Sequence, residues 1–197
     1  DVLRGVALVA SDVSDGVLDA MAGLGVKALR FTAGGASRIT GLFDLAPRMR
    51  ARGMHAEMFL GTQLLGEIGE KLLQQGVPLV LDHLGGPFDS SAGLDAPGFR
   101  YLLEFSRRDN VWLKLTPQRN STQFPLYQDA RPYFESLVES NHDRLVWGTD
   151  WPFPNMGDAT PDPGLLLDLF YEWIGKDDAL AEKILVRNAA RLYGFPG

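Results

Sequence analysis

The sequence predicts an α/β protein with a parallel β-sheet covered by helices, and three observations support this class. Short runs rich in Val, Leu and aromatic residues recur, helical patterns separate them, and turn residues mark the boundaries. Strands that alternate with helices pair in parallel, because each helix returns the chain to the starting end of the sheet. Six strands are predicted, at residues 5–10, 26–31, 54–60, 77–83, 111–116 and 145–150.

Apolar residues spaced three or four apart predict the intervening helices. The clearest examples are residues 17–24, 65–72 and 99–106. Proline suits the first turn of a helix, where no backbone N–H partner is needed, and two helices are expected to begin in this way, at Pro97 and Pro163. Three glycines each separate a helix from the next strand, where a left-handed residue is favoured: Gly25, Gly53 and Gly76. A final helix is predicted from about residue 178 to 193, ending at Gly194.

Length and composition fit one compact domain spanning residues 1–197. The chain is 45% hydrophobic and shows no linker or low-complexity segment, so a sizeable core is feasible. No apolar run approaches the roughly 20 residues that span a membrane. We therefore expect a cytoplasmic protein that is not bound to a membrane.

Charge and cysteine content exclude several classes of site. The net charge of −6 argues against nucleic acid or an anionic membrane surface as the partner, because both favour a basic stripe. The chain has no cysteine, which excludes disulfides and thiolate metal sites. An anionic small molecule must therefore be bound by local arginines.

Polar residues stand at the ends of several predicted strands: Arg30, Glu57, His83, Lys114 and Asp150. The loop after the first strand, residues 11–16, lacks the glycine spacing of dinucleotide and phosphate loops. A closed barrel and an open doubly wound sheet both remain possible. The scatter of polar residues favours the barrel, whose active site converges from separate strands.

Asp150 and His83 are the candidate catalytic residues. Asp150 follows an apolar strand and is followed at once by prolines, which places a carboxylate at a strand's carboxyl end. Its alternative role is that of a helix cap or turn former only. His83 ends another apolar strand, and its alternative is a core histidine hydrogen-bonded to backbone. His55 and His142 are interpreted as structural or surface residues.

Arg30 and Arg119 are the candidate substrate-binding residues, because a guanidinium grips a carboxylate through two hydrogen bonds. Arg30 has a salt bridge to Glu57, on the next strand, as its alternative. Arg119 lies in the loop after the fifth strand, and its alternative is a solvated loop arginine. Lys114 is interpreted as an internal ion-pair partner rather than a nucleophile.

Four segments together resemble the amidohydrolase superfamily, and most of all its 2-pyrone-4,6-dicarboxylate lactonase-like (amidohydrolase 2) branch. They are residues 79–87, 111–116, 147–152 and 188–195. The resemblance implies a (β/α)8 TIM barrel. Asp150 matches the strand-8 aspartate that activates water, and His83 matches the strand-6 histidine that helps to polarise the carbonyl. Arg30 and, less closely, Arg119 match arginines that hold substrate carboxylates.

Three departures from the family pattern bear on the expected fold and substrate. The opening strand with His-x-His is absent from these residues, and the first strand here resembles the third of eight, so we expect the first two βα units to be lacking. Gly86 stands where the dicarboxylate lactonases have an arginine after the strand-6 histidine. Phe153 replaces the usual histidine after Trp-Pro.

The resemblance implies a hydrolase that opens a lactone or related cyclic ester, with a small acidic molecule as substrate. Either no cofactor or one divalent, zinc-like ion is expected, held by His83 and Asp150 if it is present. A metal-dependent decarboxylase of the same superfamily and a non-catalytic barrel remnant are the alternatives. The strand edges left beside residues 5–10 and 145–150 make a homo-oligomer possible.

Overall fold

The six predicted strands form one parallel sheet in the computed structural model, which describes residues 3–32 and 38–196. Their spatial order is β1-β2-β3-β4-β5-β6, so each strand lies beside its neighbour in sequence. The strands are β1 Gly5–Ala7, β2 Val26–Thr32, β3 His55–Phe59, β4 Leu79–Leu81, β5 Val111–Lys114 and β6 Leu145–Val146. The predicted parallel α/β sheet is confirmed, with β1 and β6 as its edges.

Five of the six strands end earlier than their apolar runs predict, and after β4 the backbone gives the reason. After β4 ends at Leu81, four consecutive residues from His83 to Gly86 have positive φ angles of 51°, 55°, 93° and 107°. After β6 ends at Val146, Asp150 also has a positive φ, of 65°. Left-handed residues cannot continue a strand. The chemistry-bearing residues therefore lie in turns just beyond the sheet.

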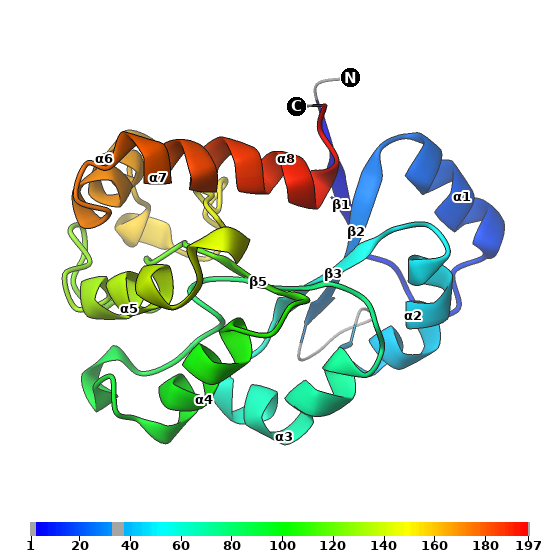
Figure 1. Ribbon diagram of the computed structural model, residues 1–197, viewed down its shortest axis with the longest axis horizontal. Coiled ribbons are helices and arrows are strands. Elements are labelled where there is room, and N and C mark those ends of the chain that lie inside the picture. The colour runs from blue at the N-terminus through cyan, green and yellow to red at the C-terminus, as the bar shows by residue number, and fades with distance from the viewer. Residues whose placement is uncertain (1–2, 33–37, 197) are drawn as a thin grey trace.

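Helices surround the strands, as Figure 1 shows, and the elements alternate as predicted. They are α1 Asp15–Gly23, α2 Gly41–Arg50, α3 Thr62–Leu73, α4 Pro97–Ser106, α5 Arg131–Asn141, α6 Pro163–Trp173, α7 Asp178–Glu182 and α8 Asn188–Tyr193. Short 3₁₀ turns lie at Ser90–Ala92, His142–Arg144 and Gly157–Ala159. Within the described ranges, no helix has the length and apolar character needed to cross a membrane.

The predicted helix boundaries agree with the structure. Helices α4 and α6 begin at Pro97 and Pro163. The glycines expected to be left-handed all have positive φ: Gly25, Gly53, Gly76 and Gly194. The predicted final helix has the expected extent but contains a π-helical turn, Lys183–Arg187, between α7 and α8.

The two faces of the sheet bury different partners. The outer face packs against the helices and forms the main apolar core. The inner face carries a small cluster of Val80, Trp112 and Val146, which packs against Ala189 and Leu192 of α8. The C-terminal end of α8 lies close to the start of β1, because Arg4, the residue before β1, donates hydrogen bonds to the carbonyls of Tyr193 and Gly194 (Figure 1). Helix α8 therefore closes one side of the inner face.

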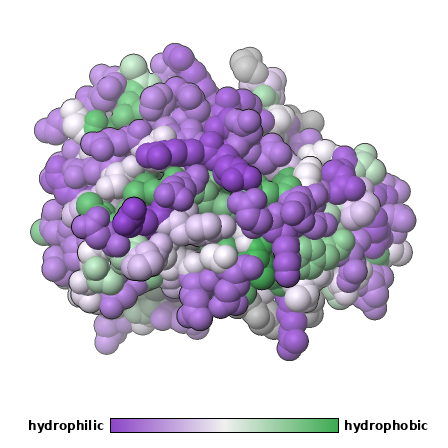
Figure 2. All heavy atoms as spheres, turned by 60° about the horizontal axis from the view of Figure 1, so that its bottom comes forward, coloured by the Kyte–Doolittle hydropathy of each residue, from purple (hydrophilic) through white to green (hydrophobic). Residues whose placement is uncertain are grey.

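The outer surface agrees with the acidic, mostly polar composition. Figure 2 shows one face covered largely by hydrophilic residues, with hydrophobic residues visible in a band across its middle. The apolar faces of the helices contribute to the buried core, whereas most of their polar side chains face outward.

A layer of paired charges lies on the inner face, above the apolar cluster. The Glu57 carboxylate contacts Lys114 Nζ at 2.5 Å and accepts a hydrogen bond from Tyr193 Oη at 2.7 Å. Asp82 lies 3.1 Å from Lys114 Nζ and 2.5 Å from Arg30 Nη1. Arg30 also lies 3.8 Å from Glu57. We call Arg30, Glu57, Asp82, Lys114 and Tyr193 the inner charge network; it joins β2, β3, β5, the end of β4 and α8.

Pairing decides whether Glu57 is stable inside the protein. Only 2% of its surface is exposed, and burial alone raises the pKa of a carboxyl group. His55, Lys114 and Tyr193 outweigh burial and lower the pKa of Glu57 from 4.5 to about 2. Removing one partner from such a buried pair typically costs about 3–5 kcal/mol, because the other charge is left uncompensated.

Gly86→Ala is expected to destabilise the protein by at least about 2 kcal/mol. A Cβ at Gly86 would lie 1.8 Å from the carbonyl oxygen of Leu60, and the φ of 107° is already strained for any other residue. The control is Gly66→Ala, because Gly66 is exposed within α3 with nothing within 4 Å of an added Cβ. The control should stabilise by about 0.5–1 kcal/mol. Urea unfolding measures both; equal midpoints for the two variants would contradict the packing argument.

Glu57→Gln is expected to make the free energy of unfolding depend less on pH between about 4.5 and 2. A carboxyl group with a folded pKa of about 2 and an unfolded value near 4.5 contributes about 3 kcal/mol above pH 4.5. That contribution is lost as the pH falls from 4.5 toward 2, because the unfolded chain takes up the proton first. Urea unfolding at several pH values between 2 and 7 checks this, with the exposed Glu104→Gln as control. If Glu57→Gln loses as much unfolding free energy on acidification as the wild-type chain, other carboxylates cause that loss.

Candidate active site

A cavity of about 290 Å³ opens on the inner face of the sheet, beside the inner charge network. Its lining includes Asp82 and His83 after β4, Lys114 at the end of β5, and Asp150 after β6, together with Arg30. The cavity therefore gathers residues from separate strand ends, as predicted. The sequence indicated four of these five; Asp82 was not among the candidates.

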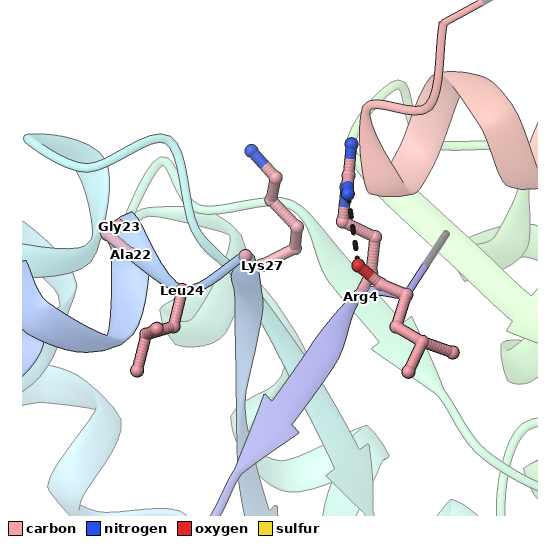
Figure 3. A pocket seen from close by; sticks show the side chains of 7 residues that line it. Arg4, Ala22, Gly23, Leu24 and Lys27 are labelled. Atoms are coloured by element: carbon pink, nitrogen blue, oxygen red, sulfur yellow. Dashed lines mark hydrogen bonds between the residues drawn. The ribbon is translucent and has the colours of Figure 1, made fainter. Parts of the chain in front are cut away.

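A larger hollow of about 540 Å³ lies at the opposite end of the strands, where β1 and β2 begin. Figure 3 shows the side chains of Arg4 and Lys27 both pointing toward its open side. Its described lining is otherwise apolar or glycine and includes no carboxylate or histidine. Size alone does not make it the reactive site, since the usual acid–base residues, histidine and the carboxylates, are absent from this lining. The smaller cavity is the candidate.

His83 and Asp150 face one another across the smaller cavity. His83 Nε2 lies 4.0 Å from Asp150 Oδ1, too long for a direct hydrogen bond and close enough for both atoms to contact one small group. The other ring nitrogen, Nδ1, is buried without a hydrogen-bond partner within the described chain. Within the described residues neither ring nitrogen of His83 hydrogen-bonds to backbone, so the catalytic role of His83 stays a prediction that the core-histidine alternative does not displace.

Burial keeps the imidazole of His83 in its neutral form. The pKa of His83 is lowered chiefly by burial, which disfavours the charged ring. The neighbouring Asp82 and Asp150 carboxylates oppose this, while Arg119 and Arg30 reinforce it. The phenyl ring of Phe59 packs edge-on against His83 with 5.3 Å between centroids. His83 thus offers a neutral imidazole to the cavity at pH 7.

Arg119 holds one oxygen of Asp150. Its Nε and Nη2 atoms lie 2.7 and 2.6 Å from Asp150 Oδ2, which leaves Oδ1 on the side of His83. The side chain of Arg119 is only 21% exposed, so the solvated-loop interpretation is wrong. The carboxylate of Asp150 binds Arg119, while its backbone carbonyl accepts a 2.8 Å hydrogen bond from the N–H of Phe153, so Asp150 also begins a turn, as its alternative interpretation expects.

Arg30 belongs to the inner charge network, where it pairs with Asp82 and lies 3.8 Å from Glu57. Its side chain is 28% exposed and lines the cavity. The salt-bridge interpretation therefore describes its contacts, and substrate binding by Arg30 stays a prediction. Lys114 is an internal ion-pair partner, as predicted.

The described residues do not fit a resident metal ion. No group of three or more His, Asp or Glu side chains lies close enough to hold one in residues 3–32 and 38–196. His83 and Asp150 supply only two donors, and Arg119 already engages one oxygen of Asp150. Structural and catalytic zinc sites use three or four protein ligands.

The sequence did not predict the contribution of Tyr193 to this region. Its hydroxyl reaches Glu57 from a position 136 residues later in the chain, and its ring packs edge-on against His55. The sequence also did not predict the hydrogen bonds that Gln118 and Asn120, in the loop that contains Arg119, make to the backbone of Thr149 and His83. Their spacing gives no local signal, because each acts on a residue from a different strand.

The chain matches known proteins over nearly its whole length. The family model described as amidohydrolase matches residues 1–195. The 2-pyrone-4,6-dicarboxylate hydrolase of Comamonas testosteroni is 35% identical over 206 residues, which cover 96% of this chain. The 4-sulfomuconolactone hydrolase of Hydrogenophaga intermedia is 33% identical over 140 residues, or 70% of this chain. The chain spans 66% of the first protein and 46% of the second.

A solved structure agrees with the sequence comparison. The crystal structure of a Pseudomonas putida protein described as a 2-pyrone-4,6-dicarboxylic acid hydrolase superposes with a TM-score of 0.83 at 28% identity. The match covers 98% of this chain and 72% of that one. The family resemblance of the four sequence segments is thereby confirmed, and the chain belongs to the amidohydrolase family.

Proposed function

We propose that this chain carries the active site of a hydrolase that opens a lactone or related cyclic ester with water activated by Asp150. The observation that carries the proposal is the Asp150 carboxylate, which keeps Oδ1 toward a neutral His83 inside the cavity. Relatives named as 2-pyrone-4,6-dicarboxylate and 4-sulfomuconolactone hydrolases support a cyclic ester as the substrate class.

The proposed reaction assigns separate roles to the two residues. Asp150 Oδ1 accepts a proton from water while the water oxygen attacks the ester carbonyl. Neutral His83 donates a hydrogen bond from Nε2 to the developing oxyanion. The ring C–O bond then breaks, and the proton held by Asp150 passes to the departing ring oxygen. The products are a carboxylate, the ring-opened hydroxyl and one released proton.

Arg119 and Arg30 would orient an acidic substrate. Both arginines line or border the cavity, and both are already paired with carboxylates. The local charges balance: the cations are Arg30, Lys114 and Arg119, and the anions are Glu57, Asp82 and Asp150. An acidic group on the substrate would therefore share a guanidinium with Asp150 or Asp82. This arrangement favours a substrate with one carboxylate over a ligand that carries several negative charges.

The wider architecture is proposed on the same basis. We infer that residues 1–197 form one domain whose six βα units correspond to six of the eight in a (β/α)8 barrel; the TM-score of 0.83 supports this. A homo-oligomer stays a prediction. Cytoplasmic location stays a prediction.

Asp150→Asn is expected to reduce kcat by on the order of 10²–10⁴-fold, because the amide keeps the shape but cannot accept the proton. Asparagine tolerates the left-handed backbone of this position, so the fold should persist. Asp158→Asn, in the exposed loop that follows, is the matched control and should retain full activity. Lactone hydrolysis followed by proton release measures both. Near-wild-type turnover by Asp150→Asn would remove Asp150 from the mechanism.

The products distinguish lactone opening from decarboxylation. Opening releases a proton without loss of carbon, whereas a decarboxylase releases CO2. We expect mass spectrometry of the products to show the addition of one water to the substrate. CO2 release from a carboxylated lactone, with no hydrated product, would favour the decarboxylase alternative and overturn the proposed function.

A further inference from the structure

Two adjacent residues of one loop hold the two candidate catalytic residues, which come from different strands. Arg119 binds the carboxylate of Asp150 after β6. Asn120 Nδ2 donates a 2.6 Å hydrogen bond to the backbone carbonyl of His83 after β4. The two contacts arise from neighbouring positions in the chain, so a shift of this loop moves both. We call residues 116–120 the clamp loop.

The rest of the clamp loop is fixed to the backbone before Asp150. Thr116 Oγ1 donates to the carbonyl of Gly148 at 3.2 Å, and Gln118 Nε2 donates to the carbonyl of Thr149 at 2.7 Å. Thr116 and Gln118 are both almost fully buried. With Arg119 on Asp150, the loop is therefore bound to three successive residues after β6, Gly148 to Asp150. Asn120 alone among these side chains reaches the segment after β4.

Both residues held by the loop have an unusual backbone. His83 and Asp150 have φ angles of 51° and 65°, in the left-handed region that residues other than glycine rarely adopt. Leu84 continues the left-handed turn after His83 with a φ of 55°. Such conformations persist only where surrounding contacts hold them. The hydrogen bond from Asn120 is one such contact on the strained turn at His83.

Both polar atoms of the Asn120 side-chain amide are hydrogen-bonded to backbone. It is 4% exposed, and its Oδ1 accepts a hydrogen bond from the backbone N–H of Phe88 at 3.3 Å. Its own N–H donates to the carbonyl of Pro117 at 3.0 Å, which closes a turn within the clamp loop. The side chain thus joins two points of the loop after β4 to the loop after β5.

We propose that Asn120 is a positioning residue that acts through His83, by fixing the strained backbone that aims the imidazole at Asp150. The kinetic part of this inference rests on the proposed function. The structural part does not, because it concerns where the His83 side chain lies in the protein without substrate.

Asn120→Asp removes the donor with almost no change of shape, since a carboxylate cannot donate to the carbonyl of His83. We expect kcat for lactone hydrolysis to fall at least tenfold while KM changes less than threefold. Asn120→Ala, which adds no charge, should behave in the same way. Ser90→Ala is the control, because Ser90 Oγ also links the two loops, through Asp129, without contacting His83. A rise in KM with kcat unchanged, or equal losses in the control, would overturn the proposal.

A double-mutant cycle with His83→Ala tests whether Asn120 acts through His83. If it does, Asn120→Ala lowers kcat in the wild-type background and has no further effect once the imidazole is absent. The same fold-loss in both backgrounds would show that Asn120 supports the fold in general and would overturn the positioning role.

Crystal structures of the full chain and of Asn120→Ala, without substrate, provide the readout that is independent of activity. We expect the His83 Nε2 to Asp150 Oδ1 separation to lengthen from 4.0 Å in the variant, with the inner charge network unchanged. An unmoved His83 ring would overturn the proposal. If the wild-type chain opens no lactone, the proposed function fails, and the crystal structures still decide the role of Asn120.

Discussion

The pairing of Glu57 with Lys114 is the interaction on which the inner face of the sheet depends. A carboxylate that is 2% exposed is tolerable only with partners on several sides, and Lys114 and Tyr193 supply two of them directly. These partners come from β5 and from α8. The requirement to neutralise one buried charge therefore holds a strand and the last helix against β3.

The same network supplies the floor of the cavity. Asp82 is shared between Lys114 and Arg30, and it directly precedes His83 in the chain. The position of His83 thus follows from a residue whose carboxylate is fixed inside the sheet. A polar interior of this kind gives less stability than an apolar one, and it preserves a place where charged intermediates are stabilised.

Backbone geometry converts two strand ends into a site. The left-handed backbone at His83 and Asp150 lies beyond the ends of β4 and β6, and both side chains line one cavity. Gly86 completes the first turn, because its missing Cβ allows the carbonyl of Leu60 to approach. An arginine at this position, as in the dicarboxylate lactonases that the sequence resembles, does not fit the backbone seen here. In the proposed function, any acidic group on the substrate is therefore assigned to Arg30 and Arg119.

The sequence by itself determined the parallel order of strands, the helix ends at proline and glycine, and the placing of His83 and Asp150 just beyond apolar strands. Each of these rests on short-range physics: apolar periodicity, turn chemistry and the position of a residue at the end of an apolar run. Tertiary structure decided the partners of Arg30 and Arg119 and revealed Tyr193 and Asn120. Those contacts join residues 27 to 136 positions apart, and they depend on strand register and on left-handed turns that no local pattern specifies.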